Sequence, residues 1–137
     1  MKILAVDYGD SRTGLATCDR TEFLTSPITP QITVKARDKV AARVCEVAKE
    51  IEAELIVIGL PLNMDGTEGP RAEKSRMVAQ RLTDATGLEV VLWDERRSSI
   101  EAHSILHANG RKEKKHRQTV DAVAASLILE GYLGTLR

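Results

Sequence analysis

Three acidic residues that lie far apart in the sequence, Asp7, Glu95 and Asp121, are the first candidates for chemistry. Asp7 directly follows the apolar run at 3–6, and Glu95 comes shortly after the apolar run at 88–93. Such runs are typical of strands buried on both faces of a sheet. Helical crossovers connect these two strands and the strand before Gly59, so the three are expected to be parallel neighbours. We therefore expect Asp7 and Glu95 at one edge of a central sheet, where open α/β sheets keep their sites. Taken alone, Asp7 could equally open an Asx-type turn.

The third acid lies on the last predicted helix. Asp121 is followed by Ala124, Ala125 and Ile128 at the spacings i+3, i+4 and i+7, so we expect its side chain to project from the apolar face toward the sheet. An ionised, unpaired carboxylate there would cost several kcal/mol. A helix-start cap or a pair with a buried arginine would explain it without chemistry.

A shared metal site is the other explanation for these acids. No His or Cys accompanies Asp7, Glu95 and Asp121, and an all-oxygen ligand set suits Mg²⁺ or Mn²⁺. Two such ions about 4 Å apart would activate water and stabilise the leaving oxygen of a phosphodiester. The three acids therefore predict metal-dependent phosphodiester hydrolysis.

A basic segment at 111–117 carries five positive charges against one negative charge. We expect it to be an exposed, mobile loop. Beside a cluster of acids and metal ions it would engage phosphates, chiefly through Lys112, Lys114 and Lys115. A solvated charge run without a ligand is the alternative.

The remaining elements follow from hydrophobic periodicity. A Gly- and Pro-rich loop at 59–70 follows a central strand. The third strand should end at its prolines and lie at the sheet edge. The fold class is α/β, a five-stranded mixed sheet flanked by helices, with strands at 3–6, 15–18, 23–28, 55–59 and 88–93 and helices at 36–52, 70–87, 98–110 and 118–133.

Composition bounds the function further. Residues 1–137 are expected to form a single domain with an aliphatic core, since only four residues are aromatic. Twenty basic and twenty acidic residues balance, so the chain as a whole makes no electrostatic case for a polyanionic partner. Cys18 and Cys45 have no metal-ligand spacing and are expected to be free thiols. With no targeting segment or apolar span, a cytoplasmic protein without a membrane partner is expected.

Four segments resemble the YqgF family, also called RuvX, which comprises Holliday junction resolvases and pre-16S rRNA processing nucleases of the ribonuclease H-like superfamily. They are DYGDSRTGLA at 7–16, GLPLNMDGT at 59–67, DERRSS at 94–99 and VDAVAA at 120–125. Their order and spacing match across essentially the whole chain. Arg97 departs from the apolar residue that many relatives carry there.

The resemblance implies a ribonuclease H-like fold in which Asp7, Glu95 and Asp121 are the metal-binding catalytic acids. It also implies that Asn63, and Arg12 or Arg96, lie near the substrate, without a defined role. The expected function is a metal-dependent endonuclease on structured nucleic acid. The favoured substrate is a ribosomal RNA precursor, processed at the 5′ end of pre-16S rRNA. Branched DNA is the second candidate substrate, and ribosomal particles are further candidate partners.

Two other functions compete with this one. The Asp-x-Gly turn at 7–9 also resembles the phosphate-binding element of actin-like ATPases and sugar kinases, although those need two such subdomains and this chain holds one. A non-catalytic RNA-binding ribosome-assembly factor could keep the same residues as a relic. The intact set of acids argues against it, whereas the zero net charge and the few aromatics argue mildly for it.

Overall fold

The structure, a computed structural model, describes residues 1–9, 12–18, 25–33, 36–94 and 113–136, with the side chains at 29–31 and 113–123 left out. Five strands form one sheet in the order β3-β2-β1-β4-β5. β1 pairs with β2 in the antiparallel direction and with β4 in the parallel direction, β2 is antiparallel to β3, and β4 is parallel to β5. The strands are β1 (Ile3–Tyr8), β2 (Thr13–Cys18), β3 (Thr25–Ile32), β4 (Leu55–Leu60) and β5 (Glu89–Asp94). The expected five-stranded mixed sheet is confirmed.

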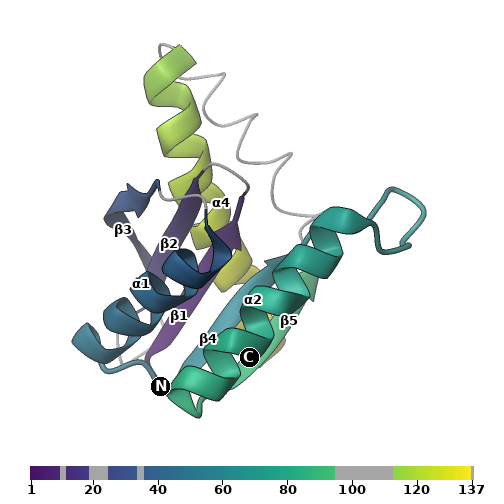
Figure 1. The fold of residues 1–137 in the computed structure, drawn as a ribbon. Helices are drawn as coiled ribbons and strands as arrows, with labels where there is room; N and C mark the ends of the chain where they lie inside the picture. Colours follow the sequence, from purple (N-terminus) through teal and green to yellow (C-terminus); the bar gives the residue numbers. More distant parts are fainter. Residues whose placement is uncertain (10–11, 19–24, 34–35, 95–112, 137) are drawn as a thin grey trace.

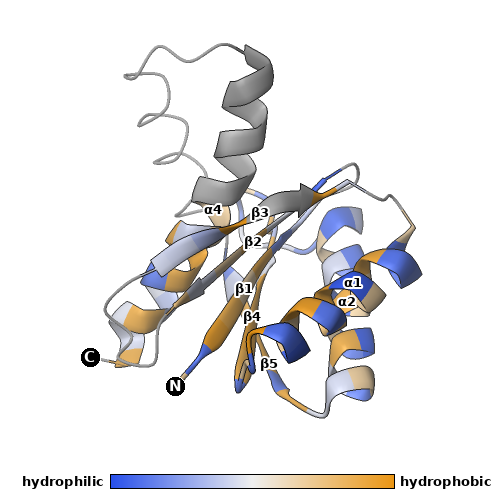
Figure 2. Cartoon of the chain, turned by 90° about the vertical axis from the view of Figure 1, so that its left-hand side faces the viewer, coloured by the Kyte–Doolittle hydropathy of each residue, from blue (hydrophilic) through white to orange (hydrophobic). Residues whose placement is uncertain are grey.

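Three described helices cover the two faces of this sheet. α1 (Arg37–Glu50) and α2 (Pro70–Thr86) lie on one face, and α4 (Glu113–Leu136) lies on the other (Figure 1). Figure 2 shows apolar positions of the described residues turned toward the sheet and polar positions turned outward. This is the amphipathic arrangement that period-3.6 apolar patterns predict.

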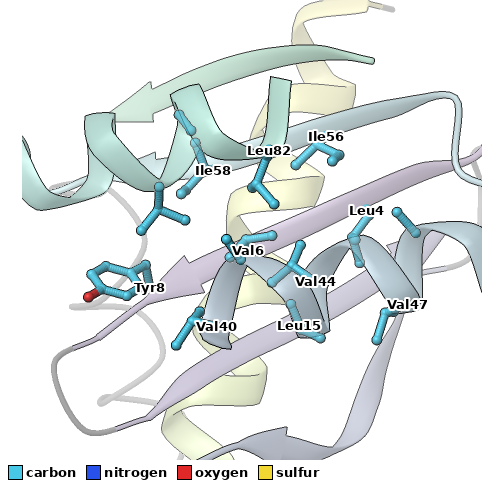
Figure 3. Packing of buried hydrophobic residues seen from close by; sticks show 14 of the residues in the cluster. Leu4, Val6, Tyr8, Leu15, Val40, Val44, Val47, Ile56, Ile58 and Leu82 are labelled. Carbon is cyan, nitrogen blue, oxygen red and sulfur yellow. The ribbon is translucent and has the colours of Figure 1, made fainter. Parts of the chain in front are cut away.

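The core has two parts, one on each face of the sheet. Alternate residues of β1 feed the two parts, because successive side chains of a strand point to opposite faces. Leu4, Val6 and Tyr8 pack with α1 and α2 (Figure 3), whereas Ile3 and Ala5 pack with α4. The largest fully buried side chains are all aliphatic, as the scarcity of aromatic residues predicted.

Helix α2 is bounded by the residues that its sequence indicated. Pro70 occupies the first turn, where its missing N–H has no helical acceptor to lose. Gly87 closes the helix in the left-handed conformation at φ 71°, and its N–H donates to the carbonyl of Thr83 at 2.9 Å. The helix therefore runs back from the carboxyl edge of the sheet to the start of β5.

The predicted bounds of β1, β2 and β3 were wrong by two or more residues, and β2 begins at Thr13 instead of Leu15. β1 continues through Asp7 to Tyr8 because the ladder with β2 extends to the pair Tyr8 and Thr13. β3 spans 25–32 and passes through Pro27 and Pro30 instead of ending at them. β3 lies at the sheet edge and pairs only with β2, and an edge strand tolerates proline, which has no N–H to donate.

The predicted loop at 111–117 was wrong over 113–117, which form the first turns of α4. Lys, Arg and Glu are good helix formers, and here they extend the helix that the apolar pattern placed at 118–133. Residues 111 and 112, and the predicted helix at 98–110, lie outside the described residues. Across the residues that the structure describes, no helix has the length and hydropathy needed to cross a membrane.

Candidate active site

Asp7 lies near the carboxyl end of β1 on the face that α4 covers. Strand alternation places it with Ile3 and Ala5, which pack against α4, and its side chain is half-buried. The parallel neighbours β4 and β5 end at the same edge, since Leu60 is paired with Asp94, the last residue of β5. The predicted position of Asp7 at the carboxyl edge of the central strands is confirmed.

Glycines flank Asp7 on both neighbouring strands. Gly14 of β2 is its partner in the antiparallel ladder. On the other side Val6 is level with Ile58 of β4, so the next residues along, Asp7 and Gly59, are level too. Residues level with one another on adjacent strands present side chains to the same face. The residues at the two cross-strand positions beside Asp7 are therefore both glycines.

The turn after β1 holds Arg12 at the same edge. A Cβ on Gly9 would lie 2.5 Å from the Arg12 carbonyl oxygen, so only glycine lets the chain pass so closely. Arg12 is half-buried and directly precedes β2. The turn therefore brings a guanidinium-bearing residue to the end of the sheet where Asp7 lies.

Asn63 holds the loop between β4 and α2. Its backbone N–H donates to the carbonyl of Thr67 at 2.8 Å, and its side-chain amide donates to Thr67 Oγ1 at 3.0 Å. Asp65 Oδ1 accepts bonds from the backbone N–H and the hydroxyl of Thr67, at 3.0 and 2.6 Å. A Cβ on Gly69 would lie 3.4 Å from Asn63 Oδ1. The Asn63 side chain is thus engaged within the loop.

A second set of contacts ties this loop to α2. Glu68 accepts hydrogen bonds from Arg76 Nε and Nη2, the latter at 2.8 Å. The hydrogen bond from Arg76 lowers the pKa of the Glu68 carboxyl below its usual range, and the same bond raises the pKa of Arg76. A bidentate arginine–carboxylate pair fixes direction as well as distance. The loop therefore leaves the sheet edge with a defined orientation.

The structure describes only part of the predicted set of site residues. Position 121 lies in α4, one turn before Ala124 and Ala125, which are buried against the sheet. No group of three metal-ligating side chains occurs within the described residues, which do not include Glu95 or the side chain of Asp121. Outside the described residues lie Glu95, Arg96 and Lys112 and the side chains of Lys114, Lys115 and Asp121.

Sequence reasoning missed the residues that shape this edge without doing chemistry. The Asp65-Gly66 pair signals a turn, but nothing in the sequence pointed to the bonds that Thr67 makes. The ion pair between Glu68 and Arg76 joins a loop to a helix and has no periodic signature. Only the strand register reveals that Gly14 lies opposite Asp7.

Comparisons with known proteins show the family of the chain. The RuvX family, described as Holliday junction resolvase, matches residues 1–135. A relative from Anaeromyxobacter dehalogenans (strain 2CP-1), named "Putative pre-16S rRNA nuclease", is 45% identical over 133 residues, which cover 97% of this chain and 96% of the relative. The family resemblance seen in the four sequence motifs is thereby confirmed.

Solved structures of low sequence identity share the fold. Thermus thermophilus RuvC in complex with Holliday junction substrate superposes with a TM-score of 0.63 at 15% identity, over 98% of this chain and 97% of that chain. The ROK hexokinase from Thermus thermophilus gives 0.51 at 20% identity, over 75% of this chain but only 38% of the hexokinase. The ribonuclease H-like fold is confirmed, and the part shared with the hexokinase is less than half of that enzyme. With a family match from residue 1 to residue 135, the chain belongs to the RuvX family of Holliday junction resolvases.

Proposed function

We propose that this chain is a divalent-metal-dependent endonuclease that processes the 5′ end of pre-16S rRNA. The observation that carries the proposal is the half-buried Asp7 carboxylate at the carboxyl edge of the sheet, with Gly14 and Gly59 beside it. The names of relatives that match nearly the whole chain support the RNA substrate. A single domain of residues 1–137 would carry the activity in the cytoplasm, on free RNA or on ribosomal particles.

The donor chemistry at Asp7 fits a hard divalent cation. A carboxylate oxygen is a ligand that Mg²⁺ and Mn²⁺ prefer, and Gly14, the residue paired with Asp7 on β2, has no side chain. Glu95 and Asp121 are the proposed further ligands. When bound, the cation would supply an activated water and charge stabilisation for the leaving oxygen. Held together without metal, the three carboxylates would repel one another.

Cleavage of branched DNA is the second candidate function. The family description, Holliday junction resolvase, favours it. Fold likeness does not choose between RNA and DNA, because function depends on the site and not on the scaffold. Both substrates therefore belong in one experiment.

The test offers the purified chain a 5′-extended 16S rRNA precursor and a four-way DNA junction, with Mg²⁺, with Mn²⁺ and with EDTA. Asp7→Asn and Asp121→Asn should each abolish cleavage, whereas Asp84→Asn should cleave like the unmodified chain. Asp84 is an exposed acid near the end of α2 and controls for the loss of one carboxylate. Thermal unfolding should show Asp121→Asn as stable as the unmodified chain or more so, since the variant removes carboxylate repulsion.

Each result has a distinct meaning. Metal-dependent cutting of the RNA alone supports the proposal, and preferential cutting of the junction supports the resolvase. RNA binding without cutting, retained in Asp7→Asn, would replace both with a ribosome-assembly factor. A large loss of thermal stability in Asp121→Asn would contradict the metal-site explanation of that residue.

A further inference from the structure

Trp93 lies on the same row of the sheet as Asp7. The register pairs Gly59 of β4 with Trp93 of β5, and Gly59 is level with Asp7 of β1. All three residues therefore present the face that α4 covers (Figure 1). Adjacent strands lie about 4.8 Å apart, so the backbones at Asp7 and Trp93 are separated by about 10 Å. Because Gly59 has no side chain, the first side chain beyond Asp7 on this side of the row is that of Trp93.

The indole of Trp93 packs against the backbone of α4 at Gly131. A Cβ on Gly131 would lie 2.7 Å from Cζ2, 3.1 Å from Cε2 and 3.4 Å from Nε1 of Trp93. Ordinary contacts of a Cβ begin at 3.4 Å, so an alanine here would push the ring and the helix about 0.7 Å apart. Trp93 also packs on the buried residues between the sheet and α4. The contact therefore sets the distance between the end of β5 and α4.

The orientation of the indole leaves its polar atom without a hydrogen bond. Trp93 Nε1 is buried and has no acceptor within the part of the chain that the structure describes. A buried tryptophan N–H usually has a partner, because an unpaired buried donor opposes folding. The six-membered ring, which carries Cζ2, is the part that reaches Gly131. Packing on Gly131, and not a hydrogen bond, therefore fixes the orientation of this side chain.

We propose that Trp93 is a positioning residue for the cation site, and that its contact with Gly131 holds the end of β5 and α4 at the separation that the metal ligands require. The inference rests on the proposed function, in which Asp7, Glu95 and Asp121 bind the cation. Glu95 follows Trp93 by two residues in the chain, and Asp121 belongs to the same helix as Gly131. A shift of about 0.7 Å at the contact would therefore change the distances between ligands on two elements. Changes to residues behind metal ligands typically lower metal affinity or activity by about 10–100-fold.

The first measurement is the affinity for Mn²⁺ without substrate, obtained by counting free Mn²⁺ with electron paramagnetic resonance. Gly131→Ala should weaken binding by about tenfold because its methyl group pushes α4 away, and Trp93→Phe should do so because the shorter ring no longer reaches the helix. The double variant should bind within about threefold of the parent chain, because the methyl group fills the space that the shorter ring leaves.

The second measurement is the fluorescence of Trp93, the only tryptophan in the chain. Mg²⁺ should shift the emission of the parent chain until the cation site is saturated, and Asp7→Asn should show no shift because it lacks a ligand. Gly131→Ala should need about tenfold more Mg²⁺ for the same shift. A purely structural tryptophan would have an emission that does not depend on Mg²⁺.

Two controls separate positioning from a loss of stability. Val44→Ala removes methyl groups from the core on the opposite face of the sheet and should bind Mn²⁺ like the parent chain, although it is less stable. Gly134→Ala adds a methyl group to α4 where nothing lies within 4 Å of the new Cβ, and it should also bind normally. Melting curves establish that every variant is folded at the temperature of the titration.

The inference is overturned if Gly131→Ala and Trp93→Phe both bind Mn²⁺ like the parent chain, or if Val44→Ala loses as much affinity as they do. It is also overturned if the double variant binds more weakly than either single variant, or if Mg²⁺ leaves the emission of a metal-binding parent unchanged. In all these cases the parent chain still binds metal, and the proposed function stands. If the parent chain binds no metal, the proposed function fails and the positioning role fails with it.

Discussion

Gly14 lies directly opposite Asp7 in the antiparallel ladder of β1 and β2. The cross-strand neighbour of the carboxylate is therefore a hydrogen atom, where any other residue would place a side chain on the same face. Gly14 does not have a positive φ, so the backbone alone would accept another residue. Whether a side chain is tolerated opposite Asp7 can be tested by substitution.

Gly14→Ala should place a methyl group beside Asp7 and reduce both metal binding and cleavage. Displacing a catalytic group by about 1 Å can cost about a hundredfold, so we expect at least a tenfold fall in the cleavage rate. The stabilisation that Mn²⁺ gives in a thermal-shift titration should fall in parallel. Gly134→Ala, at a helical glycine with open space around it, is the matched control. Normal Mn²⁺ stabilisation in Gly14→Ala would mean that the open space has no role in binding metal.

Gly131 and Gly134 should respond to alanine in opposite ways. A Cβ on Gly131 would lie 2.7 Å from Trp93 Cζ2, whereas nothing lies within 4 Å of a Cβ on Gly134. Overpacking of α4 against β5 should destabilise Gly131→Ala by about 1–3 kcal/mol. Gly134→Ala should be stabilised by up to about 1 kcal/mol, because alanine is the better helix former. Urea denaturation of both variants checks this, and equal stabilities would contradict the close packing of Gly131 on Trp93.

The strands were predictable because their signals are local. Four apolar residues before Asp7 and an unbroken apolar run from Leu55 to Ile58 specify strands buried on both faces, and the structure buries all of them. The crossover rule then places their carboxyl ends together. The position of Asp7 followed from these two facts alone, without any knowledge of its neighbours.

The rest required information that local patterns do not carry. Proline in β3 is acceptable only because that strand pairs on one side, which is a property of the whole sheet. The first turns of α4 are charged, and a charged run looks the same in a helix as in a loop. The bond that the Asn63 amide donates to Thr67, and the bond that Thr67 donates to Asp65, form only once the loop between β4 and α2 has closed.

Breaking the ion pair between Glu68 and Arg76 should loosen the loop between β4 and α2, and the effect should depend on pH. The hydrogen bond from Arg76 lowers the pKa of Glu68 in the folded protein. The ion pair therefore contributes its full stabilisation at pH values above 4.5, the ordinary pKa of a glutamate carboxyl. This stabilisation is lost as the pH falls through the lowered pKa that Glu68 has in the folded protein. Arg76→Gln should return the Glu68 pKa toward 4.5, as measured by an NMR titration, and should speed hydrogen exchange of the Gly66 amide at neutral pH.

The control for this variant is Arg71→Gln, which removes an exposed positive charge from the first turn of the same helix. It should leave the Glu68 titration unchanged. If Glu68 has the same pKa in the parent and in Arg76→Gln, the ion pair does not orient the loop between β4 and α2. Both titrations use the whole chain, so that β4 and α2 anchor the loop.

The basic residues that open α4 should control the salt dependence of nucleic-acid binding. Helical structure at 113–117 places Lys114 and Lys115 in the first turns of a helix whose later turns pack on the sheet. Each phosphate contact contributes about 0.7–0.9 to the slope of log affinity against log salt concentration. Lys114→Ala with Lys115→Ala should therefore reduce the slope by up to about 1.8, and adding Lys112→Ala should reduce it further.

The matched control, Lys39→Ala with Lys49→Ala on α1, removes two exposed lysines from the opposite face of the sheet and should leave the slope unchanged. Equal slopes for the two double variants would mean that Lys114 and Lys115 make no phosphate contact.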